Sequence, residues 1–568
     1  MTLAVLRSRR ALLLGLAALL AYTPGFWWGA PHATAADRTN AWGVDDEPPL
    51  GPLAQAHDII APKKEMNPNL GYPMLHPFMV LGAFAPYVAY LKVSGGLETP
   101  AVAYPHGFTH PADALRNLTW IAHFLSVVLA IGIVLCAYGI GRELWDESAG
   151  AMGAVFAMLV YPMFYYARNS NVDVPVLFFT SAGLWAFAVI VMRGLTTRRA
   201  AWLGVCVGCA VATKEPAFAS FLFVPLILPF MRNPGAGERL GTSATFWRSA
   251  LLATGVALGT YALAGGMVVD LARWQAHLNF IRERTQLARS GGVIFTTYYP
   301  FTMEAHAQLA WRITRLLADA LSWPGLALGV AGVVVAMRRA PRTALLACSA
   351  LVYLLILFFS ARVIQLRYVM PISFILALYA GYATVTAWRS AQAAIKWGGV
   401  ALAGSATAIL LLWATDLTYS MLRDSRYAAA GWIAGNARPG DALEYFGSEH
   451  KHPPMPPWLS SRQAIPFRGS TFRSDTSDVA VRSIVESWRE RRPRFVALVP
   501  DYTSVAGPFA ASCPPGIFRG LEDGSFGYRR AALFQTPPLI PWARRPSLDH
   551  PVVNPPIRLY ERVGEPAS

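Results

Sequence analysis

Residues 112–162 have the sequence ADALRNLTWIAHFLSVVLAIGIVLCAYGIGRELWDESAGAMGAVFAMLVYP. The apolar run at 118–140 is long enough to cross a bilayer, since a transmembrane helix needs roughly 17 to 25 such residues. A short charged segment, GRELWDES, separates it from a second apolar run at 149–166. The stretch therefore predicts two membrane-spanning helices joined by a short loop.

The composition extends this pattern to the whole chain. The chain has 568 residues, 54% of them hydrophobic, and a mean hydropathy of +0.36, well above what a soluble protein of this length needs. We expect an α-helical polytopic membrane protein with about eleven transmembrane helices. The spans are expected near 11–28, 118–140, 149–166, 172–192, 200–213, 216–231, 249–269, 319–337, 343–360, 369–388 and 397–414.

The positive charge of the chain indicates its topology. The net charge is +16, but Lys and Arg form short clusters between apolar runs instead of one basic stripe, which argues against nucleic acid as a partner. Arg7, Arg9 and Arg10 precede the first span. Of the later loops that would then lie on the same, inner side, nearly every one carries at least two cations. We expect a multi-pass protein of the cell (inner or plasma) membrane with a cytoplasmic N-terminus.

Two segments bear on that topology. The first apolar segment fits either a cleaved signal peptide or an uncleaved anchor, and we favour the anchor; both place residue 40 outside the cytoplasm. HPFMVLGAFAPYVAYLKV, at 76–93, would invert the charge pattern of every later loop if it crossed the membrane. We expect an interfacial or re-entrant helix on the outer leaflet there, within an outer loop at 29–117.

The character of the sequence changes near residue 415. Prolines, charges and short alternating segments such as DALEYF, RFVALVP and IRLYERV follow, and DSRYAAAGWIAGNARPGD predicts a helix closed by a turn. We expect a transmembrane domain at 1–414 and a small α/β extracytoplasmic domain at 415–568. The five cysteines imply neither a disulfide framework nor a metal site.

Ionisable residues gather at the outer ends of the spans. Each has an ordinary explanation: arginines reach the interface, an acid complements a helix dipole, Lys and Glu pair across a turn, and an acidic run is solvated. Their joint occurrence on one side of the membrane indicates a functional site. The set comprises Asp45, Asp46, Glu47, Arg116, Arg168, Asp173, Lys214, Glu215, Arg362 and Arg367.

Such a set suits transfer of a group from a phosphate-linked donor. A carboxylate can take a proton from an acceptor hydroxyl or amine as that atom attacks. Arginine and lysine can hold a phosphate and stabilise the charge that grows on it as it leaves. Because a phosphate leaves well without a general acid, one base and cationic contacts are sufficient for the transfer.

The order of the motifs resembles the dolichyl-phosphate-mannose protein mannosyltransferase superfamily and its bacterial aminoarabinose-transferase relatives, which have the glycosyltransferase C fold. The resemblance covers most of residues 1–430. It rests on DE after the first span, HPFMVLGAF, the stretch at 112–162, ARNSNVDVPVLFF, ATKEPAF and LRYVMPISFILALYAGY.

The resemblance implies a membrane glycosyltransferase, a hexosyl- or pentosyltransferase, with a polyprenyl-phosphate sugar donor and an inverting single displacement. Asp46 matches the general base, with Glu47 beside it, and the extra Asp45 leaves the register open by one residue. Asp173 matches the second acid. The expected contacts to the donor phosphate are Arg116, Lys214, Arg367 and Arg168.

The resemblance leaves other matters open. The acceptor can be a glycan, a lipid or a protein, and we expect no cofactor, although members of the superfamily differ in their use of a divalent metal. A transporter or lipid flippase with an outer charged gate is the alternative function. Transfer of a whole oligosaccharide or an arabinofuranosyl unit, and a non-catalytic membrane scaffold, are further alternatives.

Overall fold

The computed structural model describes residues 8–31, 41–43, 46, 50–60, 71–101, 103–231, 240–242, 244–289, 298–447, 452–464, 478–500, 513–548 and 552–563. The chain divides into two compact units. The first comprises Met1–Phe26, Gly51–Ala83 and Ala122–Thr415, and the second comprises Trp27–Leu50, Phe84–Ile121 and Asp416–Ser568. Parts of the predicted outer loop at 29–117 thus group with the C-terminal region.

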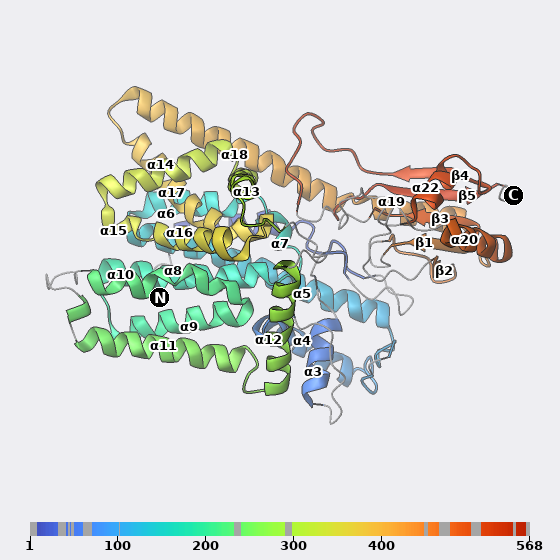
Figure 1. Cartoon of the computed structure of the whole chain (residues 1–568), viewed down its shortest axis with the longest axis horizontal. Coiled ribbons are helices and arrows are strands. Elements are labelled where there is room, and N and C mark those ends of the chain that lie inside the picture. The colour runs from blue at the N-terminus through green and yellow to red at the C-terminus, as the bar shows by residue number, and fades with distance from the viewer. Residues whose placement is uncertain are drawn as a thin grey trace. The chain divides into compact units, whose positions relative to one another are not determined.

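Helices make up nearly all of the described first unit (Figure 1). Four helices contain the residues at which the units divide: α3 (Leu50–Ile60), α4 (Leu75–Val93), α5 (Pro111–Leu144) and α18 (Ala393–Leu422). The others in the first unit are α2 (Arg9–Tyr22), α6 (Glu147–Met158), α7 (Met163–Tyr166), α8 (Asp173–Arg193), α9 (Thr197–Thr213), α10 (Phe223–Ile227), α11 (Ala244–Ala264), α12 (Leu271–Arg289), α13 (Met303–Leu321), α14 (Trp323–Arg339), α15 (Pro341–Ala344), α16 (Ala347–Ile356) and α17 (Met370–Trp388).

Several of these helices can cross a membrane. Within the described ranges, five are long and apolar enough by length and composition, or six if α13 and α14 count as one span. Those two meet at 103° around Ser322, whose hydroxyl accepts a hydrogen bond from the Gly325 N–H at the start of α14. The predicted class, a helical membrane protein with a small C-terminal sheet, is confirmed, and the exact number of spans stays a prediction.

Small residues let α17 approach its neighbours closely. A methyl group on Gly381 would lie 2.2 Å from the backbone nitrogen of Gly153 in α6, and one on Gly332 of α14 would lie 2.1 Å from the carbonyl oxygen of Tyr379. Close backbone approach at small residues is the usual way in which helices pack within a membrane. α17 is therefore tightly packed against α6 and α14.

Ion pairs join loops that were predicted to lie on the same, inner side. Arg193 contacts Glu143 at 2.5 Å, and Arg389 contacts Asp146 at 2.5 Å. These pairs bring the ends of α5, α8 and α17 together at one end of the bundle. Burial acts to raise the pKa of Asp146, but the bond from Arg389 and those from the backbone N–H groups of residues 148 and 149 outweigh it, so the pKa is lowered.

The C-terminal part of the second unit is a five-stranded sheet in the order β2-β1-β3-β5-β4. β1 pairs in parallel with β2 and β3, and β5 pairs antiparallel with β3 and β4. This confirms the predicted α/β character. The strands are β1 (Ala442–Phe446), β2 (Ser460–Gln463), β3 (Phe495–Leu498), β4 (Tyr528–Phe534) and β5 (Ile557–Arg562), and the helices are α19 (Ser425–Asn436), α20 (Asp478–Arg491) and α22 (Pro515–Glu522).

Helices cover both faces of this sheet. Successive residues of a strand point to opposite faces, so neighbouring residues of β1 pack against different helices. Leu443 and Tyr445 of β1 pack in one apolar cluster with Ile433 of α19. Phe446 packs in the other with Trp488 of α20, and α22 contributes to the same cluster. The sheet is thus the middle layer of three.

Candidate functional site

The segment before α8 is polar but buried. Arg168, Asn169, Ser170 and Asn171 are all inaccessible to solvent. The side-chain oxygen of Asn171 accepts a hydrogen bond from the backbone N–H of Asp173 at 2.9 Å, which fixes the first turn of the helix. The Asp173 carboxylate therefore starts α8, where the positive end of the helix dipole stabilises a negative charge.

Lys214 reaches this carboxylate from the end of α9. Its backbone is extended, with φ −159° and ψ 115°, where α9 ends and the short helix η1 (Glu215–Ser220) begins. Its Nζ lies 2.6 Å from Oδ1 of Asp173, and the side chains of Lys214 and Asp173 are only 12% and 4% exposed. The two residues are 41 positions apart in sequence and form a buried, charge-assisted hydrogen bond.

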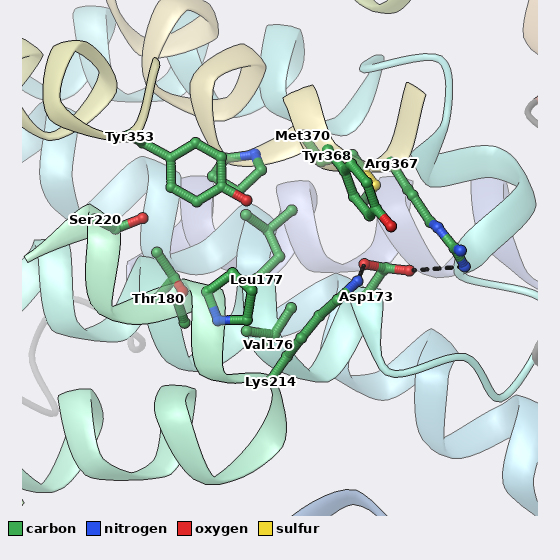
Figure 2. A pocket seen from close by; sticks show the side chains of 13 residues that line it. Asp173, Val176, Leu177, Thr180, Lys214, Ser220, Tyr353, Arg367, Tyr368 and Met370 are labelled. Atoms are coloured by element: carbon green, nitrogen blue, oxygen red, sulfur yellow. Dashed lines mark hydrogen bonds and ion pairs between the residues drawn. The ribbon is translucent and has the colours of Figure 1, made fainter. Parts of the chain in front are cut away.

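Arg367 approaches the other carboxylate oxygen, from the short helix η5 (Leu366–Val369) before α17. Its Nη1 lies 3.8 Å from Oδ2 of Asp173, and its Nε donates to Oε1 of Gln365 at 2.8 Å. Oδ2 of Asp173 has no hydrogen-bond donor among the described residues. Two cations thus converge on one carboxylate (Figure 2).

Aromatic rings surround the cluster. Nζ of Lys214 lies 5.1 Å from the ring centroid of Tyr368 and 5.5 Å from that of Tyr72. The adjoining cavity has a volume of about 20 Å³, and its lining includes Tyr353 and Ser220 (Figure 2). A cavity of this size holds a single oxygen-sized group, so a ligand at this site would present one oxygen atom to the cations.

The structure gives Arg168 other partners. Its guanidinium donates to the backbone carbonyls of Tyr22 at 3.1 Å, Phe164 at 3.0 Å and Ala21 at 2.8 Å, and the side chain is fully buried. These bonds attach the end of α7 to the end of α2. Its assignment to the donor phosphate stays a prediction that no contact in the cluster supports.

The remaining candidates for the base and the phosphate contacts, Arg116 and the acidic run at 45–47, belong to the second unit. Arg116 of α5 is 33% exposed and pairs with Asp113 at 2.6 Å. Asp46 is buried and lies close to Gly43, on which a methyl group would be 2.7 Å from the Asp46 carboxylate. Asp45 and Glu47 lie outside the described residues.

Some residues at this site were not predicted from the sequence. Nε2 of His277 in α12 contacts Oε1 of Glu215, the neighbour of Lys214 in the chain. Tyr368 follows Arg367 directly in LRYVMP, a signal that could have been used, whereas Tyr353 stands in an apolar span without one. No group of three or more His, Cys, Asp or Glu residues that could hold a metal occurs in the described part of the chain.

Part of the chain matches a known protein family. Residues 114–260 match the family described as dolichyl-phosphate-mannose-protein mannosyltransferase. The predicted family resemblance is confirmed. The matched segment contains Arg116, Arg168, Asp173 and Lys214, whereas Asp46 and Arg367 lie outside it.

Comparisons with whole proteins give distant likenesses only. No curated protein matches the chain by sequence. Among solved structures, ArnT from Cupriavidus metallidurans bound to undecaprenyl phosphate is 13% identical, with 96% of this chain and 97% of that chain covered and a TM-score of 0.47. An Archaeoglobus fulgidus oligosaccharyltransferase in complex with Zn and sulfate is 13% identical, with 93% and 79% covered and a TM-score of 0.46. The mycobacterial arabinofuranosyltransferase AftD is 14% identical, with 99% and 42% covered and a TM-score of 0.36.

Proposed function

We propose that this protein is a membrane glycosyltransferase that moves a sugar from a polyprenyl-phosphate donor to an extracytoplasmic acceptor. The observation that carries the proposal is the cluster of Lys214, Asp173 and Arg367, in which two buried cations converge on one buried carboxylate. The family match over residues 114–260 includes two of these three residues and supports the same class of reaction.

Lysine and arginine side chains that converge in a buried site can bind a phosphate oxygen by charge-assisted hydrogen bonds. Arg367 supplies the second cation, with its Nη1 3.8 Å from Oδ2 of Asp173. Lys214 offers three donors, of which Asp173 uses one. We propose that the phosphate of the donor places one oxygen in the cavity beside these two side chains.

The same cations would favour departure of the phosphate. When the bond between the anomeric carbon and the phosphate oxygen breaks, its electron pair stays on that oxygen, and the polyprenyl phosphate gains negative charge. Preorganised cations in a site of low dielectric constant stabilise such a developing charge strongly. No general acid is then needed for the leaving group.

We propose Asp46 as the general base. The acceptor oxygen or nitrogen forms a bond to the anomeric carbon on the face opposite the phosphate, and its proton passes to the Asp46 carboxylate, so one bond forms as one breaks and the configuration inverts. Glu47 is the proposed neighbour in this pair, and Asp45 is the alternative base. These assignments rest on the family resemblance of the acidic motif.

The other parts of the proposal follow from charge and exposure. Arg116 stays a proposed contact of the donor, since a third of its side chain is exposed and its carboxylate partner, Asp113, is itself well exposed. The positive-inside pattern supports a cytoplasmic N-terminus and an extracytoplasmic C-terminal domain. The acceptor is a glycan, a lipid or a protein, and no metal is assigned to the reaction.

Membranes that contain the protein provide the test. They are supplied with a panel of radiolabelled polyprenyl-phosphate sugars, and the label is followed into material that no longer carries the prenyl chain. We expect transfer from at least one donor, with kcat/KM lowered about 10- to 150-fold by Lys214→Met. Movement of an intact lipid-linked sugar across the membrane without transfer would support the transporter alternative instead.

A further inference from the structure

The segment that leads to Asp46 is anchored by backbone contacts within the second unit. The backbone N–H of Trp42 donates to the carbonyl of Gly29 at 2.9 Å. Gly29 has a φ of +72°, and a methyl group there would lie 2.9 Å from Cβ of Trp42, so the position excludes other residues. Trp42 is therefore held against the start of its own unit and is only 4% exposed.

The Trp42 ring rests on a buried ion pair. Arg426 at the start of α19 is fully buried, and its guanidinium carbon lies 3.8 Å from the ring centroid of Trp42, a close cation–π contact. Its Nε and Nη2 each donate to the Asp424 carboxylate at 2.8 Å. Nε1 of Trp28 donates to the same carboxylate at 3.0 Å.

The same ion pair binds the C-terminal end of the chain. The backbone N–H of Asn554 donates to Oδ2 of Asp424 at 2.7 Å, and Nη2 of Arg426 donates to the carbonyl of Val552. These residues directly precede β5. One salt bridge therefore joins the Trp42 segment, the junction of α18 with α19, and the segment that leads into β5.

Asp46 packs against the residue that follows Trp42. A methyl group on Gly43 would lie 2.7 Å from Oδ2 and 2.8 Å from Cβ of Asp46, closer than side chains approach one another. The carboxylate thus occupies the space that a side chain at position 43 would need. The placement of Gly43, the chain neighbour of Trp42, therefore limits where the Asp46 carboxylate can lie.

We propose that Asp424, Arg426 and Trp42 are positioning residues for Asp46, so that the C-terminal domain serves to orient the catalytic base. The proposal rests on the proposed function, in which Asp46 takes the proton. It assigns to the α/β domain a role in the chemical step, in addition to any part in binding the acceptor. The three residues act through Gly43 and do not touch the substrate.

The effect is expected in kcat. A displacement of about 1 Å at a catalytic group can cost on the order of 100-fold in rate. Gly43→Ala forces the carboxylate to move while the ion pair stays intact, and φ at Gly43 lies outside the left-handed region, so alanine fits the backbone. We expect kcat to fall by about 10- to 100-fold, with the KM for the donor nearly unchanged.

Matched variants separate positioning from stability. Gly431→Ala in α19 of the same unit meets no atom within 4 Å and is the control for Gly43→Ala. Trp42→Phe keeps a ring over Arg426 and should retain most of kcat, whereas Trp42→Leu should lose it. Arg491→Lys weakens another salt bridge of the same domain, to Glu444 at 2.6 Å, and is the control for Arg426→Lys.

The experiment measures kcat and donor KM in membranes with the radiolabelled polyprenyl-phosphate sugar that the wild type turns over best. Monodisperse elution in detergent confirms that each variant is folded. Loss of kcat in Gly43→Ala and Trp42→Leu, with recovery in Trp42→Phe, supports the proposal. Unchanged kcat in Gly43→Ala, or equal losses in Arg426→Lys and Arg491→Lys, would overturn it. An inactive wild type would instead overturn the proposed function.

Discussion

Replacing Lys214 by methionine separates the two roles that this side chain can have. The substitution keeps the length of the side chain and removes the charge that lies 2.6 Å from Asp173. Removing one member of a buried ion pair costs roughly 3 to 5 kcal/mol, because the remaining charge is left without compensation. Arg367 stays 3.8 Å from the carboxylate and compensates part of this, so we expect a loss of about 2 to 3 kcal/mol of stability.

The activity should respond for a different reason. A charge-assisted hydrogen bond to phosphate is worth about 1.5 to 3 kcal/mol, so Lys214→Met should lower kcat/KM for the donor by about 10- to 150-fold. The double variant Asp173→Asn/Lys214→Met removes both charges and should recover most of the stability while activity stays low. Thermal unfolding in detergent measures the first quantity, and transfer from the radiolabelled donor measures the second.

One result would refute this reasoning. If the double variant regains wild-type activity together with its stability, Lys214 serves only to neutralise Asp173 and does not hold the donor phosphate. Asp173→Asn alone provides the control, because it keeps both cations and removes the carboxylate that competes with the phosphate for them. We expect this variant to bind the donor at least as tightly as the wild type.

Three further predictions concern the Asp146 carboxylate, the Cys513 thiol and the dependence of the transfer activity on metal ions. The pKa of Asp146 is lowered in the folded protein, and an unfolded aspartate titrates near pH 4. The ionised carboxylate therefore stabilises the fold above about pH 4, and this contribution is lost as the pH falls through the pKa of the folded state. The difference in stability between the wild type and Asp146→Asn should shrink on acidification from pH 7 to pH 3. Burial raises the pKa of the Cys513 thiol, so a maleimide should label this residue, as followed by peptide mass spectrometry, only after the C-terminal domain unfolds. Transfer activity should survive EDTA, because Lys214 and Arg367 supply the charge at the phosphate; activity lost on chelation and restored by a divalent ion would contradict this.

The sequence predicted which ionisable residues share one side of the membrane. Asp173, Lys214 and Arg367 lie in three separate segments, and their shared side followed from counting the cations in the loops. The structure brings these three together. The strands in DALEYF, RFVALVP and IRLYERV also followed from alternation alone, and all three are present.

Partners that depend on tertiary contacts could not be predicted. Arg168 has the same residue type and predicted sidedness as Arg367, but two of its acceptors are backbone carbonyls of α2, 146 and 147 positions away. Asp424 and Arg426 resemble an ordinary helix start in the sequence, and only the fold places Trp42 over them. Neither arrangement has a periodicity or spacing that the sequence alone reveals.

The most direct test of the account is transfer from radiolabelled polyprenyl-phosphate sugars by membranes that contain either the wild type or Asp46→Asn. We predict that the wild type transfers label from at least one donor to an acceptor free of the prenyl chain. Asp46→Asn should bind that donor normally and transfer it at least 100-fold more slowly, as expected for loss of a general base. Unchanged transfer by a well-folded Asp46→Asn variant would contradict the account.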